Sequence, residues 1–177
     1  MMYRFLIFFI CFSQVISQTV TNGSFELSEG INGWSAGNSG TLTHSTTEGK
    51  NSAGAAKLVA AASSHSYIYQ TISSPTFESG TTPFRFHYWI NGTAGNKYRT
   101  VIIYDDPTDD TGVITGDTYQ GDQTFAGGWE MVHWQSSLKT GYPNGMDFTL
   151  RIQSKTHGQT FYVDDITFTG RTANTWD

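Results

Sequence analysis

Apolar and polar residues alternate along several short runs of this chain, and Gly, Asn, Asp and Pro separate the runs. In the clearest run, 84–90, every second residue is aromatic or aliphatic, and the residues between them are Arg85, His87 and Trp89. A period of two predicts a β-strand with one face toward a core. No stretch after the N-terminus has the pattern of a long amphipathic helix. The sequence therefore predicts an all-β fold, an antiparallel β-sandwich or jelly roll.

Short β-branched and aromatic runs mark the other strands that we expect. The predicted strands are Val20–Leu27, Thr41–Ser45, Ala55–Ala60, Tyr67–Ile72, Phe84–Ile90, Arg99–Tyr104, Glu130–Gln135, Asp147–Gln153 and Thr160–Thr169. The run Tyr98–Tyr104 is partly apolar on both faces, so its orientation stays open. These strands predict one domain over residues 18–170, followed by a short polar tail at 171–177.

Residues 1–17 have the features of a secretory signal peptide. Arg4 gives a positive start, an apolar run covers 5–12, and Ser17 ends a segment that resembles a small-residue cleavage site. The apolar run is too short to span a bilayer. We therefore expect a secreted, extracellular protein. Because the single cysteine, Cys11, lies in this segment, the mature chain is predicted to contain no disulfide bond.

Charge excludes some classes of partner. The net charge is −5, charged residues are only 14% of the chain, and aromatic residues reach 15%. Nucleic acids and anionic membranes select basic patches, so this composition argues against a nucleic-acid partner and against membrane insertion.

Acidic residues interrupt the predicted strands at both ends of the domain. Asp164 and Asp165 lie within the last strand, and Glu26 follows an apolar residue in the first. Neighbouring strand residues point to opposite faces, so one of the two aspartates is expected to face inward, where it needs a cation or several donors. A calcium ion shared with Glu26 is one interpretation, and unrelated surface acids are the other. The acidic loop 105–112 is consistent with a second calcium ion, although a solvated surface loop is favoured.

A series of motifs occurs in a familiar order along the chain. They are Asn22-Gly23-Ser24-Phe25-Glu26, Gly33-Trp34, Gly49-Lys50-Asn51-Ser52-Ala53, Tyr69-Gln70-Thr71-Ile72, Phe84–Trp89, Gly128-Trp129 and Val163-Asp164-Asp165-Ile166. In this order the chain resembles the galactose-binding-like jelly rolls, in particular the carbohydrate-binding modules of families four, nine and twenty-two.

The resemblance implies a structural calcium ion. Carried over to this chain, the ligands are the carboxylates of Glu26 and Asp164 and the backbone carbonyls of Ser24 and Lys50. Asp164 is preferred to Asp165 because the family motif places the ligand first.

The resemblance also implies that a glycan stacks on aromatic rings, either on a concave sheet face or at loop tips, while polar groups bind its hydroxyls. The candidate rings are Trp89, Tyr67, Tyr69, Tyr104, Tyr98 and Trp134, and the candidate polar partners are His87, Arg85, Gln135 and Arg151. Trp89 is favoured because it shares a strand face with Arg85 and His87. Trp34 and Trp129 follow glycine in family-like core positions and are expected in the core.

A polysaccharide or oligosaccharide is thus the expected ligand. A neutral β-glucan or xylan fits better than an acidic polymer, because an acidic protein repels one at long range. The chain has no Gly-x-Ser-x-Gly or His-Glu-x-x-His motif, so we expect no enzyme. Two alternatives stay open: an adhesin or matrix protein without a sugar site, and a polysaccharide lyase or glycoside hydrolase. Such modules are often joined to an enzyme, which suggests a catalytic partner protein.

Overall fold

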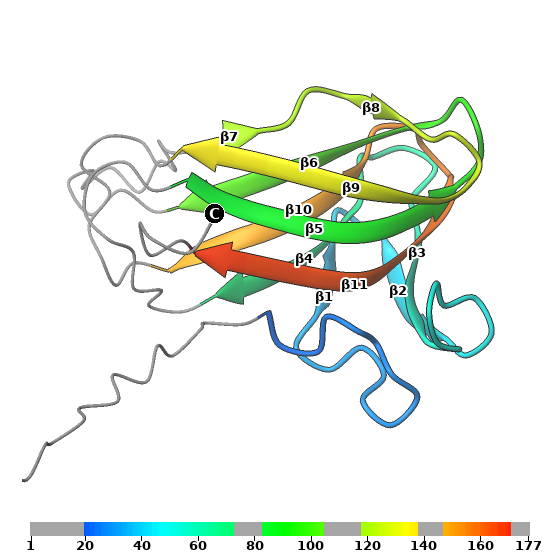
Figure 1. The fold of residues 1–177 in the computed structure, drawn as a ribbon. Helices are drawn as coiled ribbons and strands as arrows, with labels where there is room; N and C mark the ends of the chain where they lie inside the picture. Colours follow the sequence, from blue (N-terminus) through cyan, green and yellow to red (C-terminus); the bar gives the residue numbers. More distant parts are fainter. Residues whose placement is uncertain (1–19, 73–82, 105–117, 138–146, 171–177) are drawn as a thin grey trace, which may run out of the picture.

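The computed structural model describes residues 20–72, 83–104, 118–137 and 147–170, which form two antiparallel sheets packed face to face (Figure 1). This confirms the predicted all-β sandwich. The predicted signal peptide, the acidic loop 105–112 and the tail 171–177 lie outside the described residues. Within the described ranges, no helix is long and apolar enough to cross a membrane.

One sheet, called sheet A, has the order β1-β4-β10-β6-β7, with β8 also paired to β6. Its strands are β1 (Ser35–Gly37), β4 (Tyr67–Ile72), β6 (Lys97–Tyr104), β7 (Thr118–Tyr119), β8 (Gln123–Thr124) and β10 (Phe148–Ser154). The other, sheet B, has the order β2-β3-β11-β5-β9. Its strands are β2 (Thr41–Ser45), β3 (Ala55–Val59), β5 (Pro83–Gly92), β9 (Gly128–Ser137) and β11 (Thr160–Gly170).

The core lies between the two sheets and follows the predicted alternation. In β5, Phe86, Tyr88 and Ile90 are fully buried. From sheet A, Ile68 and Ile152 face them, also without exposed area. Burial of large apolar side chains is the main favourable term in folding, so these inner faces hold the sandwich together.

The predicted strand Val20–Leu27 is wrong, because this segment forms turns. Asn22 and Phe25 have positive φ angles of 50° and 47°, which interrupt an extended strand. The segment still lies against β11, since the Ile166 N–H donates to the Gly23 carbonyl at 2.9 Å. A Cβ at Gly23 would lie 2.1 Å from the Ile166 carbonyl oxygen, so this close approach requires glycine.

Candidate functional site

An aromatic pair lies on the outer face of sheet A. In β4, Ile68 and Ile72 point into the core, so the alternating Tyr67 and Tyr69 point outward. The two tyrosine rings pack edge to face, with centroids 5.7 Å apart. The Arg151 guanidinium carbon lies 4.4 Å from the centroid of the Tyr67 ring. The structure thus brings together three of the predicted ligand-binding residues on two neighbouring strands.

The Tyr67 ring is positioned by the edge strand as well as by Arg151. Gly37 of β1 is the register partner of Tyr67. A Cβ on Gly37 would lie 2.2 Å from Cζ of the Tyr67 ring, so only glycine leaves room for the ring beside the β1 backbone. The Tyr67 ring therefore packs against the β1 backbone on this face.

Polar side chains lie beside the aromatic pair on the outer face of sheet A. Arg151 is the register partner of both Tyr69 and Val101, and Gln153 is the partner of Tyr67 and Arg99. The Arg151 Nε is buried and has no hydrogen-bond partner within the described structure. Its guanidinium is therefore positioned by stacking on an aromatic ring rather than by an acceptor.

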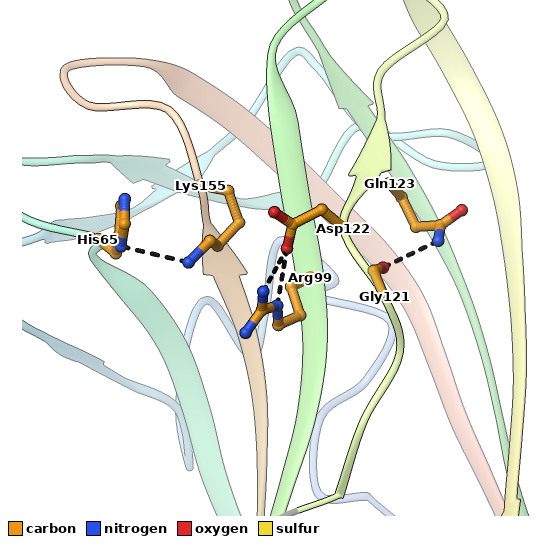
Figure 2. Close-up of polar contacts among 6 residues, drawn as sticks. All are labelled: His65, Arg99, Gly121, Asp122, Gln123 and Lys155. Carbon is orange, nitrogen blue, oxygen red and sulfur yellow. Dashed lines mark hydrogen bonds and ion pairs between the residues drawn. The ribbon is translucent and has the colours of Figure 1, made fainter.

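Arg99 forms an ion pair at the far side of this face. Its Nε and Nη2 donate to Asp122 Oδ1 at 2.8 and 2.6 Å. The hydrogen bond from Arg99 holds the pKa of the Asp122 carboxyl below its usual value. Between this pair and the start of β4, Lys155 Nζ lies 3.3 Å from His65 Nδ1 (Figure 2). Burial, and then the charge of Lys155, lowers the pKa of His65.

The face therefore contains residues that the sequence interpretation did not select as site residues: Gln153, Arg99, Asp122, Lys155 and His65. The sequence did contain a signal for Gln153, which lies two residues after Arg151 in a run whose intervening residues are apolar. Residues two apart in a strand point to the same face, so the two polar side chains are expected side by side. No local pattern marks Asp122, since its position depends on the pairing of the two-residue strand β8 with β6.

Trp89 and His87 lie on the opposite side of the sandwich. Because Tyr88 and Ile90 point into the core, their neighbours in β5 face outward from sheet B. Trp89 is half-buried, and Lys50 Nζ lies 4.5 Å from its ring centroid. The His87 ring stacks on the ring of its partner His133, with centroids 4.4 Å apart. The predicted ligand set is thus divided between two faces that the core separates.

Two candidate aromatic ligands belong to the core instead. Tyr98 is 4% exposed and packs on Phe125, and Trp134 is 9% exposed and stacks on Phe86. A ring so deeply buried offers no face to a sugar, so both predictions are wrong. The expected core position of Trp34 is confirmed at 6% exposure, with its Nε1 donating to backbone carbonyls. Trp129 is only half-buried.

Three candidates have side chains outside the described part of the structure. Their backbones place them in the sheets: Tyr104 pairs with Phe148, and Arg85 pairs with Gln135. Their roles stay predictions.

Asp164 occupies an unusual place in β11. It is 1% exposed, and a bulge follows it, with a register shift before Thr167 and a positive φ of 49° at Asp165. Its Oδ2 accepts the backbone N–H of Lys50 and its Oδ1 that of Asp165, each at 2.8 Å. Burial raises the pKa of the Asp164 carboxyl to about 6, against the opposing effect of these hydrogen bonds.

The turn that precedes Glu26 lies against the loop before β3. A Cβ at Gly54 would lie 1.8 Å from the Phe25 carbonyl oxygen, and His44 Nε2 donates to that oxygen at 2.8 Å. The Glu26 side chain is exposed. Lys50 presents its N–H to Asp164. Whether the carbonyls of Lys50 and Ser24 bind a metal stays a prediction.

These residues fit a hard cation in one respect. A buried carboxylate with a raised pKa lacks charge compensation, which a calcium ion supplies. No cluster of three His, Cys, Asp or Glu side chains occurs among the described residues. A calcium ion at Asp164 therefore depends on backbone oxygens for most of its ligands, as the resemblance implies.

Neither a protein-family model nor a curated protein matches this sequence. Solved structures do match it. The CBM22-2 xylan-binding domain from Paenibacillus barcinonensis Xyn10C superposes with a TM-score of 0.63 at 14% identity, covering 84% of this chain and 98% of that one. A CBM61 in complex with β-1,4-galactotriose superposes with a TM-score of 0.59 at 14% identity, covering 88% and 99%.

A larger protein also contains this fold. The enzymatically active domain of tailspike protein 4 from bacteriophage CBA120 superposes with a TM-score of 0.62 at 12% identity, covering 87% of this chain. The chain spans only 21% of that protein. Together these matches show that the chain has the jelly-roll β-sandwich fold seen in solved carbohydrate-binding modules.

Proposed function

We propose that this chain is a secreted, non-catalytic module that binds a polysaccharide on the outer face of sheet A. The observation that carries the proposal is the cluster of Tyr67, Tyr69 and Arg151. Sugar rings have apolar C–H faces that stack on aromatic rings, and their hydroxyls need polar partners. The cluster offers two rings for stacking, and Gln153 beside it offers an amide for the hydroxyls.

The proposed ligand is a polysaccharide with a neutral sugar backbone, a β-glucan or a xylan. The acidic net charge of the chain supports this choice, because an acidic protein repels a polyanion at long range. Two modules of similar fold are described as xylan-binding or as bound to β-1,4-galactotriose, which supports a plant-type polysaccharide.

The carboxylates near these surfaces support binding rather than catalysis. A glycosidase needs two carboxylates with separated pKa values on either side of the scissile bond. Asp122 is held ionised by Arg99. Asp164 is buried, and its carboxylate accepts hydrogen bonds from backbone N–H groups. A catalytic partner protein is proposed only from the resemblance.

The proposed module contains a structural calcium ion at Asp164, with Glu26 and the carbonyls of Ser24 and Lys50 as the other ligands. The ion would neutralise the buried carboxylate and tie the N-terminal turn to β11. Secretion is proposed from the signal-like pattern of residues 1–17.

Replacing Tyr69 with alanine tests the face. Loss of one stacking ring is expected to weaken binding of a β-1,4-linked xylo- or gluco-oligosaccharide by about 5- to 100-fold, by analogy with the 1–3 kcal/mol of base stacking. The melting temperature is expected to change little, because the ring is only half-buried. Calorimetric titration and a thermal melt measure the two effects.

Trp89→Ala is the matched control, since it removes a half-buried ring from the opposite face of the sandwich. It is expected to leave glycan affinity unchanged. Loss of binding in Trp89→Ala, with Tyr69→Ala unaffected, would move the site to sheet B. No binding of any neutral or acidic glycan by the folded wild-type protein would reject the proposed function.

A further inference from the structure

Cationic side chains gather at one end of the aromatic face. His65 precedes β4, Lys155 follows β10, and the Lys155 N–H donates to the Lys97 carbonyl at 2.8 Å, which joins the end of β10 to the start of β6. The next row of the sheet contains Tyr67, paired with Gln153. We call this group the basic end; its members are Lys97, Arg99, Lys155, His65 and His157.

The basic end is positive in an otherwise acidic chain. Lys97, Arg99 and Lys155 all act on Asp122, the carboxylate that pairs with this group. Leaving histidines out of both counts, these three cations and Asp122 give a local charge of 3 − 1 = +2, whereas the whole chain has a net charge of −5. Such a local excess of positive charge has a cost in the free protein that a bound anion would remove.

Lys155 has an unusual partner for an ammonium group. It donates to the imidazole Nδ1 of His65 at 3.3 Å (Figure 2). No ion pair of Lys155 occurs within the described residues. The Gln153 amide donates to the His65 carbonyl, and the His157 ring packs 4.7 Å from the His65 ring. The ammonium is therefore positioned by a weak neutral acceptor, which an anionic oxygen can replace with a stronger, charge-assisted bond.

We propose that the basic end binds an anionic substituent of the glycan, while the neutral backbone stacks on Tyr67 and Tyr69. The substituent is a singly charged oxygen acid, a uronic carboxylate or a sulfate ester, and Lys155 is its main ligand. This inference rests on the proposed function and specifies its substrate: a neutral backbone that carries occasional acidic branches.

Three oligosaccharides with the same sugar backbone test whether the basic end binds an acidic substituent. One is neutral, one carries a single uronic-acid branch, and one carries a single sulfate ester. At low salt, at least one acidic ligand is expected to bind the wild-type protein about tenfold more tightly than the neutral one, from one charge-assisted hydrogen bond. This preference should shrink as sodium chloride is added, because salt screens exposed charges.

Lys155→Met is expected to remove most of the preference and to leave affinity for the neutral ligand within about twofold, since it keeps the apolar stem and removes the charge. Lys57→Met is the matched control. Lys57 lies on sheet B, with its ammonium nitrogen 5.8 Å from the centroid of the Tyr162 ring, so this variant should keep the preference for the acidic ligand. If Lys155→Met fails to fold, Lys97→Gln, at an exposed position of the basic end, gives a second test of the same loss of preference for the acidic ligand.

The outcomes separate the two proposals. Equal affinity for all three ligands overturns the acidic-substituent inference and leaves the proposed function standing. A preference that survives in folded Lys155→Met also overturns it. A carboxylate-only or sulfate-only preference supports it and identifies the acid, whereas no binding of any ligand rejects the proposed function itself.

Discussion

Trp134→Ala is expected to destabilise the protein by about 3–5 kcal/mol, the usual cost of removing a large aromatic side chain from a packed core. Trp134 is 9% exposed, and its ring stacks on Phe86 with centroids 6.2 Å apart. Removing it opens a cavity between β9 and the other sheet that the rigid strands of sheet B cannot easily close. Glycan affinity of the remaining folded protein should be unchanged.

Urea unfolding at fixed temperature measures this effect, and titration with a neutral oligosaccharide measures binding in the same samples. Met131→Ala is the control on the same strand, because Met131 is 59% exposed and points outward. Its unfolding free energy should change by less than about 0.5 kcal/mol. If Trp134→Ala lost glycan binding at unchanged stability, Trp134 would return to the ligand-binding site.

The sequence predicted the strands well where alternation was clear. In β5, the apolar residues Phe86, Tyr88 and Ile90 are all buried, because a period of two is a local property that tertiary packing preserves. It failed at Tyr98, whose strand is partly apolar on both faces, so the pattern did not specify which face turns inward. It also failed over Val20–Leu27, where positive φ angles replace an extended strand.

The candidate site was predictable only in part. The pairing of Tyr69 with Arg151 joins β4 to β10, which are far apart in the sequence. Strand order and register come from non-local packing, so no local pattern shows that these two side chains share a face. For the same reason, the sequence did not show that Trp89 lies on the opposite side of the sandwich from Tyr67 and Tyr69. Its role as a ligand stays a prediction.

Calcium is expected to raise the melting temperature of this protein at about pH 7.5, and the effect should shrink as the pH falls through about 6. Without metal, burial raises the pKa of the Asp164 carboxyl from 3.8 to about 6, so the folded state binds this proton more tightly than the unfolded state does. The stability that protonation gives is fully present below pH 3.8 and is lost as the pH rises through about 6. It amounts to about 3 kcal/mol at 1.36 kcal/mol per pKa unit.

A calcium ion bound to the ionised carboxylate would reverse this loss by mass action, contributing about 2.7 kcal/mol at 100 times its dissociation constant. Metal-stripped protein, melted in EDTA and in excess calcium across this pH range, gives the measurement. Asp164→Ala should melt below the wild type in calcium, because two backbone N–H groups lose their acceptor, and it should not respond to EDTA. Glu29→Gln removes an exposed acid and should keep the full calcium response. Identical melting curves with EDTA and with calcium at about pH 7.5 would show that Asp164 holds no metal and that its hydrogen bonds alone support the buried charge.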